Sequence, residues 1–239
     1  MHRFVWDLHY PPPDSLNHEI PISAIYKDTP QLPLGAWALP GNYTVKLTAD
    51  DKSYAQPLVV KMDPRVTSSL AEVAKQFEMQ SGSVEGMNES YEMLQQVQSV
   101  RAQLKNRMGV SKSLPSSLLD SIRALDKQAA ELEGGAQSNF FGVPPSGKQA
   151  ENLSSLNQHF GATLALADSA DAAPTTQATA AYKELESELE SLLGRWSKLR
   201  KDEIPALNTQ LRNANLPAVD PNLLPASKPA ADADGDDEP

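Results

Sequence analysis

The stretch VVKMDPRVTSSLAEV, residues 59–73, marks a change in the spacing of the apolar residues. Before it, apolar residues alternate with polar ones, as at Tyr43, Val45 and Leu47. After it, they recur every three or four residues for most of the remaining length. The period therefore changes from the two residues of a β-strand to the roughly 3.6 residues of an α-helix. We expect a small β unit, a rigid Asp-Pro junction, and a long helical region after it.

The β unit is predicted to hold three or four strands. RFVWDLHY (3–10) alternates and predicts a strand with one buried face, and HEIPISAIY (18–26) adds a short edge strand in spite of its proline. Residues 42–49 and 53–62 predict a hairpin with ADDK (49–52) at its tip. An immunoglobulin-like sandwich needs about seven strands. We therefore expect Met1 to lie inside a domain of a longer natural protein.

The helical region is predicted to hold about four helices, each with one apolar stripe. The first begins at a cap supplied by Thr67 or Ser68 and is long, with two glycines in QSGSVEGMN (80–88) that allow a bend. The next ends at Gly134-Gly135, and the third covers about 148–170. The fourth runs from Pro174-Thr175 to a kink or break at Pro205, before a last turn through Leu207 and Leu211. Such helices with short connections are typical of an antiparallel bundle.

The predicted fold class is α+β, with three segments. Residues 1–63 form a partial immunoglobulin-like β domain, residues 64–216 form the elongated helical bundle or coiled coil, and residues 217–239 form a disordered acidic tail. The tail is rich in Pro, Ala and Asp and has no apolar stripe. The predicted structural core consists of Phe4, Trp6, Trp37, Tyr43, Val45, Leu47, Phe77, Tyr91, Leu94, Phe160, Leu189 and Trp196.

Composition narrows the range of partners and compartments. The 239-residue chain has a formal net charge of −10 and no basic cluster, which disfavours nucleic acid. It has no cysteine, which excludes disulfides and thiolate chemistry. No stretch reaches the roughly 18 apolar residues of a membrane span, and MHRFVWDLHY (1–10) lacks the pattern of a signal peptide.

The sequence predicts no catalytic, cofactor-binding or metal-binding residue. The four histidines have no ligand spacing. The carboxylates of KELESELES (183–191) recur at four-residue spacing, which is typical of a solvated helix face. Trp6, Trp37 and Tyr43 could stack a sugar or a peptide, but aromatic residues on a strand face more often belong to a core. These residues argue against an enzyme.

Three segments resemble the C-terminal region of large bacterial exported proteins of the BNR-repeat or sortilin-like β-propeller glycosyl hydrolase type. They are RFVWDLHYPPP (3–13), the segment from GAWALPGNYTV to VVKMDPRV (35–66), and the segment from ADAAPTTQATA to LRNANLP (170–217). The resemblance extends from residue 3 to about residue 217. In that family a propeller comes first, an immunoglobulin-like module follows, and a helical bundle closes the chain.

The resemblance implies a non-catalytic scaffold or interaction region of an exported protein, found in the periplasm, on the cell surface or secreted. The partner would be an upstream β-propeller in the same or a separate chain, and the helical bundle offers a surface for a protein partner or self-association. The propeller repeats have no counterpart in this sequence, so no hydrolase residue carries over. Two alternatives stay open: an accessory part of a propeller glycosyl hydrolase, and a stand-alone oligomerising helical protein.

Overall fold

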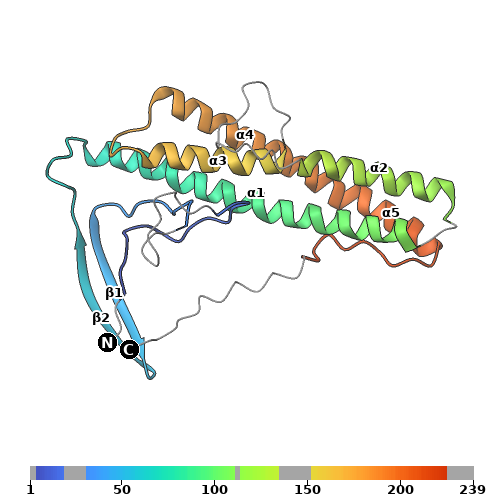
Figure 1. The fold of residues 1–239 in the computed structure, drawn as a ribbon, viewed down its shortest axis with the longest axis horizontal. Coiled ribbons are helices and arrows are strands. Elements are labelled where there is room, and N and C mark those ends of the chain that lie inside the picture. Colours follow the sequence, from blue (N-terminus) through green and yellow to red (C-terminus); the bar gives the residue numbers. More distant parts are fainter. Residues whose placement is uncertain (1–3, 19–30, 111–113, 135–151, 225–239) are drawn as a thin grey trace. The chain divides into compact units, whose positions relative to one another are not determined.

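The computed structural model describes residues 4–18, 31–110, 114–134 and 152–224, and these residues are mostly helical, with a small antiparallel sheet (Figure 1). The predicted edge strand at 18–26, the loop FFGVPPSG (140–147), the predicted start of the third helix and the last part of the tail lie partly or wholly outside the described residues. The elements are β1 (Gly41–Ala49), β2 (Lys52–Val60), α1 (Leu70–Val110), α2 (Ser116–Glu133), α3 (Leu153–Asp168), α4 (Thr176–Lys198), the π-helical segment η1 (Leu199–Glu203) and α5 (Ile204–Asn213).

The chain divides into two compact units. The first unit contains Met1–Glu89 and Leu156–Glu188, and the second contains Ser90–Ser155 and Leu189–Pro239. The long helix α1 supplies residues to both units, as do α3 and α4. This division differs from the predicted boundary at residue 63, because the β hairpin and the start of α1 belong to the same unit.

The predicted hairpin is confirmed. Strands β1 and β2 pair antiparallel from Gly41 opposite Val60 to Ala49 opposite Lys52. Asp50 and Asp51 form the two-residue turn with φ angles of 48° and 60°. A tight hairpin turn of the primed type needs positive φ at both central residues, and Asp tolerates this conformation better than most residues.

The junction after the hairpin ends in a helix cap. Asp63 accepts hydrogen bonds from the Arg65 guanidinium, with the shortest at 2.6 Å. Ser69 then caps α1, because its backbone N–H donates to Glu72 Oε2 at 2.8 Å and its hydroxyl accepts from the Glu72 N–H at 3.3 Å. These two hydrogen bonds form a capping box. The prediction of Thr67 or Ser68 as the cap is wrong by one or two positions.

Residues 4–10 do not form the predicted strand. Leu8 has a φ of 66°, which interrupts the extended backbone. The Trp6 indole N–H donates to the His9 carbonyl at 2.8 Å, which curls the segment back on itself. Only one isolated antiparallel bridge, between His9 and Trp37, represents β pairing in this segment. The alternating aromatic residues of this segment therefore lie on an irregular backbone and not on a strand.

In the first unit, two glycines of α1 admit aromatic rings. A Cβ on Gly86 would lie 2.5 Å from a ring carbon of Phe160, and a Cβ on Gly82 would collide with the Tyr182 hydroxyl. The two rings also meet edge to face, with centroids 6.3 Å apart. The glycines that predicted a bend are therefore sites of close approach, where the absence of a side chain lets α3 and α4 pack on α1.

In the second unit, apolar side chains and a partly buried ion-pair network hold the helices together. The predicted end of the second helix is confirmed, since Gly134 follows α2 with a φ of 71°. Arg101 on α1 forms ion pairs with Asp126, at 3.0 Å, and with Glu133, both on α2. Trp196 is 4% exposed, and its indole N–H donates to Gln96 at 3.0 Å.

The helix at Pro205 continues instead of breaking. Pro205 occupies the first turn of α5, where its missing N–H costs little. The π-helical segment η1 precedes it, and the Ile204 N–H bonds to the carbonyl of Leu199. The wider π turn thus accommodates the lost donor without ending the helix.

Residues 217–220 are held by hydrogen bonds to helices of the second unit, so the predicted start of a disordered tail at residue 217 is wrong. Val219 is 2% exposed. Its N–H donates to Asn208 Oδ1 at 2.7 Å, and its carbonyl accepts from Asn208 Nδ2 at 2.8 Å. Gln103 bonds in the same two-way manner to the backbone of Asp220, at 2.8 and 2.9 Å. Side-chain amides therefore replace the backbone pairing that a strand or helix would supply.

Burial divides the predicted core residues into three groups. Leu94, Phe160, Leu189 and Trp196 are buried, which confirms the prediction for them. Trp6, Tyr43, Phe77 and Tyr91 are half-buried. Phe4, Trp37, Val45 and Leu47 are exposed, with Phe4 at 88%. The exposed group lies on segments that were expected to form a covered β face, and the described residues do not provide the cover.

We predict that Gly86→Ala destabilises the protein. The new methyl group must displace the Phe160 ring, and such overpacking costs about 1 to 3 kcal/mol. The matched control is Gly109→Ala, also in α1, where a Cβ would meet no atom within 4 Å. Urea unfolding followed by circular dichroism measures both variants. Equal free energies of unfolding for the two variants would contradict the close approach at Gly86.

We predict that Val219→Ala lowers the free energy of unfolding by about 1 to 3 kcal/mol, because it leaves a void under a packed segment. The control is Leu223→Ala, four residues away, where the side chain is 55% exposed. Thermal unfolding of both variants is the measurement. If the two substitutions have the same small effect, the segment is not packed as described.

Candidate functional site

The β hairpin has one mainly apolar face and one face of mixed polarity. Residues directly opposite in the register point to the same side of a sheet, and successive residues alternate. The register pairs Tyr43 with Leu58 and Leu47 with Tyr54, with Val45 between them on the same face. The opposite face carries polar residues along β1 but Val59, Pro57 and Ala55 along β2. On this face the Thr48 and Ser53 hydroxyls bond at 3.0 Å. We call the side chains of Tyr43, Val45, Leu47, Tyr54 and Leu58 the hairpin apolar face.

Most of the hairpin apolar face is exposed. Val45 is 52% exposed, Leu47 is 62% exposed and Tyr54 is 57% exposed. Near the helix end of the hairpin, Tyr43 and Leu58 are half-buried. Scattered single apolar residues on a surface are normal, whereas a large contiguous apolar patch is typical of an interaction site.

Aromatic contacts fix the covered end of this face. The rings of Trp6 and Tyr43 meet at 64° with centroids 5.5 Å apart. The Tyr43 hydroxyl donates to the Leu39 carbonyl at 2.6 Å. Partial burial raises the pKa of Tyr43, and the neighbouring Tyr10 raises it further. The root of the hairpin is thereby held by the N-terminal segment, and the outer part projects uncovered.

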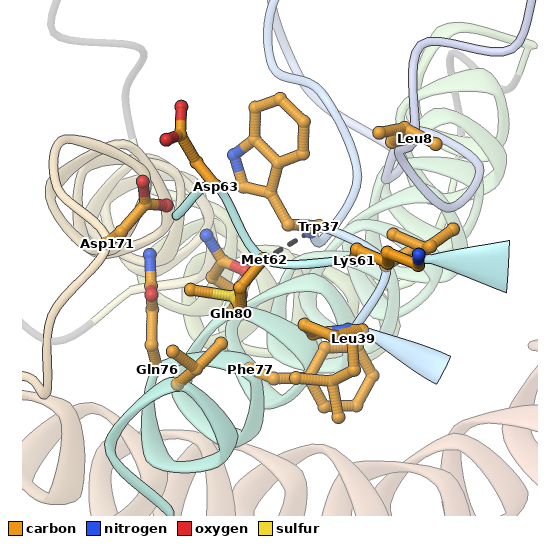
Figure 2. A pocket seen from close by; sticks show the side chains of 14 residues that line it. Leu8, Trp37, Leu39, Lys61, Met62, Asp63, Gln76, Phe77, Gln80 and Asp171 are labelled. Carbon is orange, nitrogen blue, oxygen red and sulfur yellow. Dashed lines mark hydrogen bonds between the residues drawn. The ribbon is translucent and has the colours of Figure 1, made fainter. Parts of the chain in front are cut away.

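A cavity of about 280 Å³ lies in the same unit, between the root of the hairpin and α1 (Figure 2). Its walls are mainly apolar, and they come from the segments before and after the hairpin and from α1. The apolar lining residues are Leu8, Trp37, Ala38, Leu39, Pro40, Val60, Met62, Val73 and Phe77. The polar lining residues are Lys61, Asp63, Gln76, Gln80 and Asp171. The size approaches that of small-ligand sites.

Gln80 holds a central position in the cavity lining. Its side chain is buried, at 1% exposure, and its Oε1 accepts the Trp37 backbone N–H at 3.2 Å. Its Nε2 is buried and has no hydrogen-bond partner within the described residues. The neighbouring Gln76 differs, because its Nε2 donates to the carbonyls of Ala167 and Ala170 at 2.7 and 2.9 Å. Of these two amides, only that of Gln80 has a donor without a partner among the described residues.

Trp37 forms one wall of the cavity with a partly exposed ring. The indole is 39% exposed. The indole also contacts the His9 ring. The two ring centroids are 3.9 Å apart, and the two ring planes are tilted by 39° relative to each other. This ring contact holds the indole, and the hydrogen bond from the Trp37 backbone N–H to Gln80 holds the main chain that carries it. A fixed, partly exposed aromatic ring is suited to stacking against a planar ligand.

Charged groups lie at the edge of the cavity. Figure 2 shows Asp63 and Asp171 on the side toward which the Gln80 amide nitrogen is turned, and Lys61 on another side. Asp63 already pairs with Arg65, and this pairing lowers the pKa of Asp63. Asp171 uses its backbone carbonyl to accept the Ser68 hydroxyl at 2.6 Å. Of the two aspartates at the rim, Asp63 is paired with Arg65 and Asp171 is not.

The described residues give no support for a metal or catalytic centre. No group of three or more His, Asp or Glu side chains within them is placed to hold a metal ion. The pKa of Tyr182 is raised, first by burial and then by Glu186, but the Tyr182 ring lies in the packed core against Phe160. In the part of the chain that the structure describes, no helix is both long and apolar enough to cross a bilayer. The absence of a catalytic site, cofactor and metal remains a prediction.

Sequence reasoning missed Gln80 and its surroundings. Gln76 and Gln80 are four residues apart and both buried, together with Ser83 one turn further along α1. Polar residues at helical spacing on a face that packs inward are the signal that could have revealed them. Trp37, Tyr43 and Trp6, which could have stacked a ligand together, are separated by the structure into two places: Trp37 at the cavity, and Trp6 with Tyr43 at the hairpin root.

No protein-family model, no curated protein and no solved structure matches this chain.

We predict that Trp6→Leu releases the root of the hairpin. The ring-proton resonances of Tyr43 should move toward the values of an unstructured tyrosine, because the ring current of the indole is lost. The control is Trp37→Leu, which removes an indole from the cavity wall instead. Two-dimensional NMR of the two variants is the measurement. Unchanged Tyr43 resonances in Trp6→Leu would contradict the contact.

Proposed function

We propose that the chain is a non-catalytic scaffold and interaction region, whose hairpin apolar face is covered by the strands of a neighbouring β module. The single observation that carries this proposal is the exposure of Val45, Leu47 and Tyr54 on one face of a regular hairpin. Burying such side chains contributes about 1.5 to 3 kcal/mol each. The proposed cover completes a sandwich of the immunoglobulin type, and the helices form an antiparallel bundle that extends from it.

The edges of the hairpin favour strands as the covering element. The described sheet has two strands, so each has an outer edge of unpaired backbone groups. A two-stranded hairpin alone is at best marginally stable in water. Added strands would satisfy these edges and place a second sheet over the apolar face, whereas a helix would cover the face and leave the edges unpaired.

Charge disfavours a second copy of this chain as the cover. The formal net charge is −10, so association of two copies brings like charges together. We therefore assign the cover to a different module, supplied upstream in the same reading frame or by a separately encoded partner. The resemblance to exported β-propeller proteins supports this choice, since in that family a β-rich region precedes the helices.

The test compares the chain alone with the chain joined to the polypeptide encoded immediately upstream of the Met1 codon. Leu47→Ala should cost about 2 to 5 kcal/mol in the joined protein, as for a buried leucine. In the chain alone, where Leu47 is 62% exposed, the same substitution should have little effect. Thr44→Ala, on the polar face of β1, is the control and should be nearly neutral in both proteins.

Light scattering distinguishes the alternatives. The proposal is supported if the chain alone is a monomer and if Leu47→Ala lowers the free energy of unfolding only in the joined protein. A mass twice that of the chain, unchanged by Leu47→Ala, would instead indicate a stand-alone oligomerising protein that pairs through its helical stripes. Glycosidase activity of the joined protein that falls when the hairpin is altered would favour an accessory part of a hydrolase.

A further inference from the structure

The cavity contains a buried donor that needs an acceptor. Gln80 lines the cavity with a side chain at 1% exposure, and no described residue accepts a hydrogen bond from its buried Nε2. A buried polar group without a partner costs free energy that a bound acceptor recovers. The orientation of the amide is fixed, because Gln80 Oε1 is occupied by the Trp37 N–H at 3.2 Å. The free donor is therefore a directional feature of the cavity.

We propose that this cavity is a binding site for a small, neutral ligand that joins a planar apolar ring to a carboxamide-type group. The ring stacks on the partly exposed Trp37 indole, which lines the cavity. The carbonyl oxygen of the ligand accepts from Gln80 Nε2. This site is independent of the hairpin apolar face and of the partner assigned to it.

Asp171 at the rim of the cavity favours an N–H donor in the polar group of the ligand. The Asp171 carboxylate lies on the side toward which Gln80 Nε2 is turned (Figure 2). A carboxamide places an N–H donor beside its carbonyl acceptor, so one group can bond to both Gln80 and Asp171. A ligand carboxylate would have no donor for Asp171 and would meet two aspartates there, one of them paired with Arg65.

Benzamide is the probe, and NMR of the tryptophan indoles is the measurement. The protein has three tryptophans, so Trp37 can be observed beside two internal references. Benzamide should shift the Trp37 indole N–H resonance along a saturable curve in the millimolar range, which is typical of a ligand of this size. The resonance of Trp196, buried in the second unit, should not move. Absence of a saturable shift at Trp37 would overturn the proposal.

Gln80→Glu tests the role of the donor. The substituted side chain keeps an oxygen for the Trp37 N–H and replaces the Nε2 donor by an acceptor. Benzamidine is the matched probe, because it has the shape of benzamide and presents donors only. The ratio of the benzamidine Kd to the benzamide Kd should fall at least tenfold in Gln80→Glu, and an unchanged ratio would overturn the proposal.

Ser83→Ala is the matched control on the same helix. Ser83 is also buried, and its hydroxyl has no hydrogen-bond partner within the described residues, but it does not line the cavity. This variant should keep the wild-type ratio of the two Kd values. A tenfold change in Ser83→Ala as well would show that the response is a general loss of packing in α1 and would overturn the assignment to Gln80. Circular dichroism confirms that each variant is folded before its titration.

Discussion

A two-stranded hairpin with one apolar face cannot bury that face by itself. Its own backbone bonds satisfy only the inner edges of β1 and β2, and its side chains lie above and below a single layer. In this protein the aromatic contact of Trp6 with Tyr43 covers the root, and the outer part, including Leu47, stays exposed. The need for a second layer connects the fold of the first unit to its proposed role.

The parts that the sequence predicted well are those governed by local periodicity and turn chemistry. The hairpin, its Asp50-Asp51 tip and the end of α2 at Gly134 follow from spacing and from residues with special backbone preferences. Leu94 and Trp196 were predicted as core residues because helical stripes must pack on one another, and both are buried. In these regions, the local spacing of apolar residues and the packing between distant segments favour the same structure.

The errors arise where tertiary contacts decide the local structure. Residues 4–10 alternate like a strand, yet the Trp6 to His9 bond and the positive φ of Leu8 give an irregular segment. Residues 217–220 look like a disordered tail, but Asn208 and Gln103 supply pairing from distant helices. Gln80 gave no recognisable motif, because its significance depends on a cavity formed by segments far apart in the sequence.

The most direct measurement is amide hydrogen exchange over residues 41–60, in the protein isolated from its native source and in the chain alone. Coverage by a β module predicts slow exchange along both hairpin strands in the native protein and fast exchange at their outer edges in the chain alone. Equally fast exchange in both samples would mean that the hairpin apolar face has no cover, and it would contradict the proposed role.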